Sequence, residues 1–255
     1  MLHHGWQKLV ESFQARFEVV PANSDSLRDE VYRVRHRVYC EEFRFERISE
    51  DGLERDQYDH CSTSILIRDV PAGEFIACAR IVHTNPCSPA DPLPFEVATQ
   101  GRLNESLLCS RPVNRASVGE ISRLAVVSRY RRRKGDAGSP APLSHEDFSE
   151  APGSRFPFIL AGLYLGILAS ASIEKMQRLY LLSEARLATH IGRIGVGIIP
   201  IGEPIEYRGM RIPSMIEVAE VTTALRGYIH TLYEDIYSRI IGDGDEQLSG
   251  TGSGK

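Results

Sequence analysis

One stretch constrains this chain more than any other, an apolar strand pattern that carries both an acid and a base: Val118-Gly-Glu120-Ile-Ser-Arg123-Leu-Ala-Val-Val127. A strand of this composition is expected inside a sheet. Charged side chains are almost never buried without a partner. Glu120 and Arg123 are therefore expected to pair, to face a cleft, or to do both.

The spacing of these two charges makes a further demand. Side chains alternate between the two faces of a regular strand, so residues three apart point to opposite faces. Glu120 and Arg123 can share one cleft only if the strand holds an extra residue. We therefore predict a β-bulge between them. A regular strand with Arg123 facing solvent would contradict a shared site.

Composition narrows the class of protein. The 255 residues are 42% hydrophobic and 25% charged, with a net charge of -4, which is ordinary for a globular protein and argues against nucleic-acid binding. The five cysteines include no Cys-x-x-Cys pair, and the eight histidines lack zinc-ligand spacing. We expect a reduced, cytoplasmic protein with no metal and no signal peptide.

Apolar periodicity predicts a mixed α/β order, with antiparallel strands first and a strand-helix-strand crossover later. Strands are expected at 17–20, 62–68, 74–84, around Glu120, and at 177–183, 198–203 and 215–221. Helices are expected from an N-cap within 23–26 to about 39, near 102–108, and at 156–173, 185–194 and 222–240.

Two segments interrupt this order. Residues 131–157 contain Gly, Ser and Pro clusters without an apolar period, which indicates an inserted loop, and residues 242–255 have the composition of a disordered tail. Residues 156–173 carry no charge, and the length of this run is at the lower limit for a membrane span. Their glycines and other small residues favour a helix packed on a sheet. We expect one domain over 1–241.

Three more polar groupings lie near predicted strands or helices. Arg35 and Tyr39 are four residues apart on one helix, Asp56 and Asp59 precede the second strand, and Arg80 lies within an apolar strand. Taken singly, each is most simply an exposed or capping charge. Their joint occurrence in this order favours a shared site.

In that order, these residues resemble the signature of the autoinducer synthases, the acyl-homoserine-lactone synthases of the GNAT superfamily. The residues that carry the resemblance are Arg35, Tyr39, Phe45, Asp56, Asp59, Arg80, Glu120 and Arg123. The length, the insert and the Glu-Ile-Ser-Arg-Leu form are more similar to acyltransferases associated with PEP-CTERM/exosortase systems, a branch related also to N-acyl amino acid synthases.

The resemblance implies a GNAT-like fold, an α/β sheet flanked by helices and splayed between two central parallel strands, here the Glu120 strand and 177–183. It also implies an acyl donor on a phosphopantetheine arm, usually acyl carrier protein, an amine acceptor, and no permanently bound cofactor. Glu120 and Arg123 are the implied catalytic residues. The implied substrate-binding residues are Arg35, Tyr39, Phe45, Asp56, Asp59, Arg80 and Ser183.

The residues alone are consistent with this chemistry. An α-amino group has a pKa near 7.7 to 8, so it needs only a weak base at neutral pH. Glu120 could take its proton, directly or through water. Backbone N–H groups where the strands part could hold the oxyanion, and Arg123 would orient Glu120 or pair with Asp56 or Asp59.

A basic run begins at the end of this strand, with Arg131, Arg132, Arg133 and Lys134. We favour contact with the acidic surface of an acyl carrier protein. The spacing Arg132-x-x-Gly135-x-Ala137 also fits a coenzyme A pyrophosphate loop, although the next helix is expected some twenty residues later. A solvated charge run is the third interpretation.

The leading hypothesis is an N-acyltransferase that moves a long-chain acyl group from acyl carrier protein to an amino-acid-like amine. The alternatives are an acyl-homoserine-lactone synthase using S-adenosylmethionine, a coenzyme A dependent N-acetyltransferase, and a non-catalytic module that binds a fatty acyl group. The sequence leaves open whether the protein makes peripheral contact with a membrane.

Overall fold

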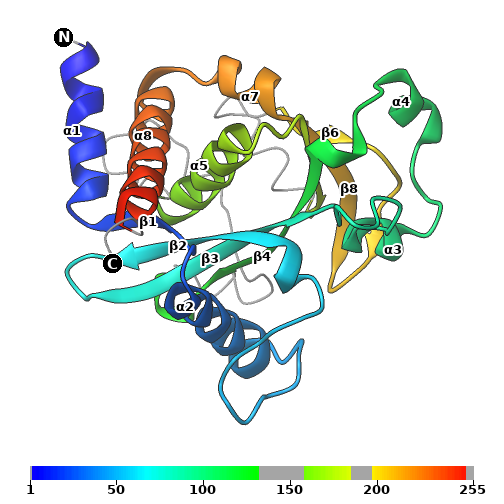
Figure 1. The fold of residues 1–255 in the computed structure, drawn as a ribbon, viewed down its shortest axis with the longest axis horizontal. Coiled ribbons are helices and arrows are strands. Elements are labelled where there is room, and N and C mark those ends of the chain that lie inside the picture. The colour runs from blue at the N-terminus through cyan, green and yellow to red at the C-terminus, as the bar shows by residue number, and fades with distance from the viewer. Residues whose placement is uncertain (1, 132–157, 185–196, 251–255) are drawn as a thin grey trace.

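In the computed structural model, one central sheet separates two layers of helices (Figure 1). The structure describes residues 2–131, 158–184 and 197–250. The strands are β1 (Phe17–Pro21), β2 (Ser62–Asp69), β3 (Glu74–His83), β4 (Val118–Val126), β5 (Arg178–Ser183), β6 (Ile199–Pro200), β7 (Ile205–Glu206) and β8 (Met210–Glu217). The α-helices are α1 (Leu2–Gln14), α2 (Asp25–Arg35), α3 (Pro94–Thr99), α4 (Glu105–Ser110), α5 (Phe158–Ile173), α7 (Val218–Ala224) and α8 (Gly227–Gly250).

The strand order in the sheet is β1-β2-β3-β4-β5-β8-β6, with β7 paired to β8. Neighbouring strands are antiparallel except β4 and β5, which are parallel. Their ladder runs only from Val118 opposite Arg178 to Ile121 opposite Leu181, and both strands continue beyond it. The two central strands therefore separate partway along the sheet, as the resemblance implied.

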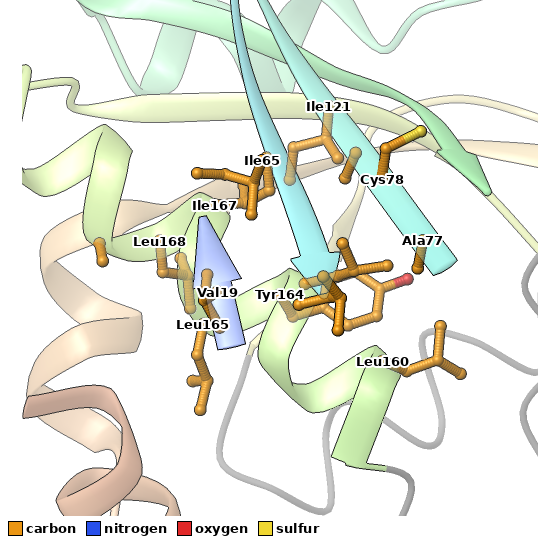
Figure 2. Packing of buried hydrophobic residues seen from close by; sticks show 14 of the residues in the cluster. Val19, Ile65, Ala77, Cys78, Ile121, Leu160, Tyr164, Leu165, Ile167 and Leu168 are labelled. Carbon is orange, nitrogen blue, oxygen red and sulfur yellow. The ribbon is translucent and has the colours of Figure 1, made fainter. Parts of the chain in front are cut away.

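The uncharged helix expected at 156–173 is α5, and it packs closely on the sheet. A Cβ added to Gly166 would lie 2.8 Å from Val19 and 3.0 Å from Ile65, and one at Gly162 would lie 3.0 Å from Phe13. Figure 2 shows the apolar side chains of α5 against β1, β2 and β3. Because glycine lacks a Cβ, these two residues let the backbone of α5 approach the side chains of the neighbouring elements closely.

The helix α2 covers the opposite face of the sheet (Figure 1). Ser24 caps its N-terminus, where the hydroxyl accepts from the Leu27 N–H at 3.3 Å, within the range that the sequence predicts. The helix continues as a π-helical turn over His36–Glu42. Both Arg35 and Tyr39 are buried there against the sheet.

Two predictions about the C-terminal part were wrong. The strand expected at 215–221 is β8, which ends at Glu217 and is followed by the short helix α7. Pro213 argues against a strand at this point of the sequence, because proline lacks the N–H that a ladder needs. In the structure, however, Pro213 lies opposite Leu182 in the pairing of β8 with β5. The single helix expected at 222–240 is two helices, separated before Gly227, whose φ is +58°. The second helix runs to Gly250.

Most of the remaining expectations are confirmed, but the strand expected at 198–203 is only the two-residue β6. The hairpin of β2 and β3 is present, as are β1, β4 and β5. The short helix near 102–108 is α4, and α3 was not predicted. The inserted loop at 131–157, apart from Arg131, and the helix at 185–194 lie outside the described residues. The domain limits stay a prediction. The tail expected to be disordered from residue 242 instead begins as part of α8, which is helical to Gly250.

Candidate functional site

Charged side chains from four parts of the chain gather on the α2 side of the sheet. Arg80 of β3 is 1% exposed. Its Nη1 donates to Asp56 Oδ1 at 2.6 Å and to Asp59 Oδ1 at 2.7 Å, and its Nη2 donates to Asp56 Oδ2 at 3.0 Å. A buried arginine needs this degree of pairing, because an unpaired charge in the interior is costly. The exposed-charge interpretation of Arg80 was therefore wrong.

Arg35, at the end of α2, completes the inner part of this cluster and is fully buried. Its Nε donates to the Glu54 carboxylate and its Nη1 to Asp59 Oδ1 at 2.5 Å. Burial alone would lower the pKa of Arg35, but the two carboxylates raise it above its ordinary value. Arg35 therefore stays charged and holds the loop of residues 43–58 against the sheet.

Arg123 joins the cluster from β4. Its Nη2 lies 3.0 Å from Asp56 Oδ2 and 3.1 Å from Glu54 Oε1, and it donates to Glu46 Oε1 at 3.3 Å. Its guanidinium lies over the Tyr39 ring, 5.6 Å from the centroid. The predicted pairing of Arg123 with Asp56 is present.

A bulge in β4 directs Arg123 to this position. One residue of β3, Ala79, is opposed by two residues of β4, Arg123 and Leu124. Arg123 has a φ of +52°, in the left-handed region that non-glycine residues rarely adopt. The predicted bulge is present, and it lies at Arg123 itself rather than before it.

Glu120 faces the same side of the sheet as Arg80. Its ladder partner on β3 is Val82, two residues from Arg80, and residues two apart share a face. Ser122, two residues beyond Glu120, accepts from Arg80 Nε at 3.2 Å. The described ion pairs of Arg123 do not include Glu120, so the two charges border one region without a direct bond.

The carboxyl group of Glu120 has an unusual environment. Its side chain is 4% exposed, and Oε2 accepts from the backbone N–H of Phe95 at 2.6 Å. The pKa of Glu120 is raised to about 8. Burial is the main cause and the nearby carboxylate of Glu96 acts in the same direction, while the Phe95 N–H, Arg80 and Arg123 act in the opposite one. A carboxyl group with this pKa can exchange a proton near neutral pH.

Asp56 has the opposite behaviour. Burial alone would raise its pKa, but hydrogen bonds from Arg80 and the charges of Arg123 and Arg35 lower the pKa to about 2. Asp56 is therefore a permanent anion at neutral pH. Glu120 and Asp56 therefore differ in kind, because the first can exchange a proton near neutral pH and the second cannot.

Two aromatic residues implied by the resemblance lie beside Arg123. Tyr39 donates its hydroxyl to the Leu124 carbonyl at 2.9 Å, across the bulge. Phe45 lies 6.5 Å from Tyr39 between ring centroids and stacks on Phe43 at 5.2 Å. The tyrosine thereby supports the backbone of the bulge, and the rings wall this side of the cluster.

The structure does not bring Ser183 to this cluster. Its hydroxyl donates to the Ile212 carbonyl at 3.3 Å and lies 3.2 Å from the Ser214 hydroxyl. Residues of β5 alternate in face, and Tyr180, not Ser183, is on the side of Glu120. The role of Ser183 in substrate binding therefore stays a prediction.

Of the basic run, only Arg131 is described. It forms an ion pair with Glu42 at 2.5 Å, donates to the Val126 carbonyl at 2.9 Å and lies over the Phe43 ring. These contacts tie the end of β4 to the end of the α2 segment. Arg132, Arg133 and Lys134 lie outside the described residues, as does the spacing that fits a coenzyme A loop.

Three members of the site were missed by the sequence interpretation: Glu46, Glu54 and Arg208. Glu54 is 6% exposed and pairs with both Arg35 and Arg123. Glu46 pairs with Arg208, which lies in the turn before β8 and stacks over Phe45. The acidic composition of residues 44–59 was a signal for the two glutamates. Nothing in the sequence around Arg208 indicates its pairing with Glu46, which lies 162 residues away.

The residues that the structure describes contain neither a candidate metal site nor a candidate membrane-spanning helix. In those parts of the chain, no group of three or more His, Cys, Asp or Glu side chains is arranged to hold a metal ion. Within the same ranges, no helix combines the length and apolar character needed to cross a membrane.

Comparisons with known proteins identify the fold. Residues 34–138 match the acetyltransferase (GNAT) domain model, a segment that includes all the acids and bases described above except Arg208. The fold is that of the GNAT acyltransferases. Among curated proteins, none matches the chain by sequence.

Three solved structures show the same fold at low sequence identity. The AHL synthase LasI is 19% identical with a TM-score of 0.56, over 83% of this chain and 95% of that one. FeeM, an N-acyl amino acid synthase from uncultured soil microbes, is 14% identical with a TM-score of 0.54, over 82% and 95%. BjaI, a CoA-dependent acyl-homoserine lactone synthase solved with SAM and isopentyl-CoA, is 17% identical with a TM-score of 0.53, over 87% and 89%.

Proposed function

We propose that this chain is an N-acyltransferase of the autoinducer-synthase type. It transfers a fatty acyl group, which we expect to be long, from acyl carrier protein to the amine of an amino acid or a related small acceptor. The observation that carries this proposal is Glu120: a buried carboxyl group with a pKa of about 8, on the face that holds the charged cluster, where β4 and β5 separate.

The reaction balances with the groups present. The bound ammonium group first loses one proton to solvent. The neutral amine nitrogen then attacks the thioester carbonyl carbon, which forms the C–N bond and places negative charge on the carbonyl oxygen. Glu120 takes the proton from the amine, and collapse of the tetrahedral intermediate breaks the C–S bond. The same proton then passes to the leaving thiolate, so the carboxylate is regenerated.

The oxyanion needs hydrogen-bond donors in a place free of strand pairing. The ladder between β4 and β5 ends at Ile121 and Leu181. Backbone N–H groups beyond that point are the candidates, because preorganised donors of this kind stabilise a tetrahedral intermediate. The thioester would then lie between the separating strands.

The acceptor would meet the accessible edge of the charged cluster. Arg35 and Arg80 are fully covered and act through their partners, whereas the side chains of Arg123 and Asp56 are 14% and 19% exposed. An amino acid carries a carboxylate and an amine. Arg123 suits the first group and the permanent anion Asp56 suits the second while it is still protonated.

The identities of donor and acceptor are the finer part of the proposal. BjaI is named as CoA-dependent and was solved with SAM, while FeeM is named as an N-acyl amino acid synthase. Coenzyme A as donor and S-adenosylmethionine as acceptor are therefore the second candidates. The association with exosortase systems, the cytoplasmic location and the role of Arg131, Arg132, Arg133 and Lys134 at a carrier protein also remain predictions.

The test is a matrix of donors and acceptors. The purified chain is incubated with acyl carrier proteins that bear acyl groups of several lengths, and with the matching coenzyme A thioesters, in the presence of single amino acids or S-adenosylmethionine. Thiol release and product mass are measured. We expect thiol release and an N-acyl amino acid with long acyl carrier protein thioesters.

Turnover with acetyl-CoA alone would overturn this proposal in favour of an N-acetyltransferase, and saturable acyl binding without thiol release would indicate a non-catalytic module. Glu120→Gln should abolish most of the turnover. Glu18→Gln is the matched control, because Glu18 is a half-exposed glutamate at the far edge of the sheet, on β1.

A further inference from the structure

The short helix α3, which the sequence did not predict, closes over Glu120. Besides the hydrogen bond from its backbone N–H to Glu120, Phe95 contributes a ring that is 1% exposed. The ring stacks on Tyr180 with centroids 4.5 Å apart and planes at 20°. Tyr180 is the ladder partner of Glu120 on β5. One residue of α3 therefore both bonds the carboxyl group and covers the tyrosine beside it.

A second ion pair, outside the charged cluster, holds α3 in this place. Arg115 donates to Glu96 through both arms, from Nη1 to Oε1 at 2.7 Å and from Nη2 to Oε2 at 2.6 Å. It also donates to the carbonyls of Asp91 at 3.0 Å and Pro89 at 3.2 Å. A two-armed guanidinium–carboxylate pair fixes orientation as well as distance. The segment before α3 and α3 itself are thus tied to one side chain.

The helix needs such an anchor because it is short. It has six residues, too few for a helix to be stable on its own in water. Glu96 Oε2 also accepts from the Leu93 N–H at 2.7 Å, which closes the first turn. Arg115 comes directly before β4 and only five residues before Glu120. The anchor and the carboxyl group therefore lie on the same stretch of chain.

We propose that Arg115 is a positioning residue: by holding Glu96, it keeps α3 where the Phe95 N–H bonds Glu120 and the Phe95 ring keeps water away. The consequence for catalysis rests on the proposed function, in which Glu120 takes a proton. The geometric part does not, since it concerns the surroundings of one carboxyl group.

The proposal has a measurable effect on protonation. Glu120 is faced by Arg80 from β3, Arg123 from β4, Glu96 from α3 and Tyr180 from β5. Burial is the largest influence on its pKa. If α3 loosens, water reaches the carboxylate and lowers its pKa by stabilising the charged form, whereas loss of the Phe95 N–H hydrogen bond raises it. Burial is the larger of the two influences, so the pKa of Glu120 falls from about 8 toward the ordinary value for glutamate.

The experiment follows the titration of Glu120 by carboxyl ¹³C NMR in glutamate-labelled protein, assigned with Glu120→Gln. Arg115→Ala should lower the midpoint by one pH unit or more. Arg115→Lys should lower it by less, because lysine keeps the charge and one contact. Arg111→Ala is the matched control, since Arg111 is a half-exposed arginine whose ion pairs are with Glu217 and Glu220, and it should leave the midpoint unchanged.

A double-mutant cycle tests whether Arg115 acts through Glu96. Glu96→Ala should lower the midpoint at least as far as Arg115→Ala does, because it also removes a carboxylate that itself raises the pKa of Glu120. The double variant should lower it no further than Glu96→Ala alone. With an active donor and acceptor in hand, Arg115→Ala should lower kcat about tenfold or more, as expected for a displaced base, and change KM less than twofold.

An unchanged Glu120 midpoint in Arg115→Ala, or the same shift in Arg111→Ala, would overturn the proposal. If Arg115→Ala does not fold, Arg115→Lys takes its place: a lowered Glu120 midpoint supports the proposal and an unchanged one overturns it. The titration needs no substrate. A failed substrate matrix would therefore overturn the proposed function while the NMR midpoints still decide the role of Arg115.

Discussion

Arg35 and Arg80 donate to the same carboxylate oxygen, Oδ1 of Asp59, at 2.5 and 2.7 Å. Two cations that share one acceptor repel each other, and other anions nearby are needed to offset that repulsion. Glu54 does so on the side of Arg35, and Asp56 on the side of Arg80. Together these contacts join α2 and β3 to the loop between them.

Removal of Asp59 should therefore be strongly destabilising. Asp59→Ala leaves two buried guanidinium groups short of a partner, and we expect a loss of about 3–5 kcal/mol in the free energy of unfolding. Denaturant titration measures it. Glu30→Ala, which removes one member of an exposed ion pair on α2, should change stability by less than about 0.5 kcal/mol. Equal losses in the two variants would contradict a cooperative buried network.

The rate of acyl transfer should depend on pH through Glu120. Because the carboxyl group must be ionised to accept a proton, kcat/KM should rise with pH and level off above about 8. Glu120→Gln should lower kcat at least about 100-fold and remove that rise. The acceptor amine titrates nearby, so two acceptors whose amine pKa values differ by a unit or more are compared. A midpoint that follows the amine would assign the rise to the substrate.

The contribution of Glu120 to the stability of the protein should decrease as pH rises. A salt-bridged acid shows the opposite trend. The pKa of Glu120 is raised in the folded state, so the folded protein holds this proton more tightly than the unfolded chain. Its contribution to stability is present at low pH and is lost as pH rises from the unfolded value, near 4.5, to about 8.

Glu120→Gln removes this linkage. Relative to the wild type, we expect the variant to gain stability as pH rises from 5 to 9, by roughly 1.4 kcal/mol for each unit of pKa shift relieved. Thermal unfolding at several pH values checks the trend. A difference between the two proteins that does not vary with pH would show that Glu120 is ionised in the folded state throughout.

Two substitutions of Arg123 distinguish the role of its backbone conformation from the role of its charge. Both Arg123→Gly and Arg123→Ala remove the ion pairs with Glu54 and Asp56, so both should lose most of the activity. At a φ of +52° glycine is unstrained and alanine is not. We therefore expect the glycine variant to be about 1 kcal/mol the more stable by denaturant unfolding. The reverse order would mean that the bulge relaxes when the guanidinium is lost.

The packing of α5 on the sheet makes a prediction independent of the charged residues. Gly166→Ala would place a Cβ 2.8 Å from Val19 and 3.0 Å from Ile65, and we expect a loss of about 1–3 kcal/mol from overpacking. Gly242→Ala is the matched control, since its Cβ meets nothing within 4 Å in α8. There alanine should stabilise the protein, by up to about 1 kcal/mol.

Local patterns predicted much of the fold because they report local physics. The apolar runs of β2 and β3, the Ser24 cap and the uncharged run of α5 each depend on neighbours in sequence. The bulge in β4 was also predictable, since two charges three residues apart cannot otherwise reach one face. Pro213 shows the limit, because tertiary pairing with β5 kept it in a strand against its local preference.

By itself, the sequence determined which residues are too polar for their apolar surroundings, and so which ones need partners. Arg80, Glu120 and Arg123 are of this kind. The tertiary structure alone decided who those partners are. Glu46 pairs with Arg208 across 162 residues of chain, and Phe95 reaches Glu120 only because α3 is anchored by Arg115. Such pairs depend on strand register and loop path, which are set by the energy of the whole packed molecule rather than by any local run of residues.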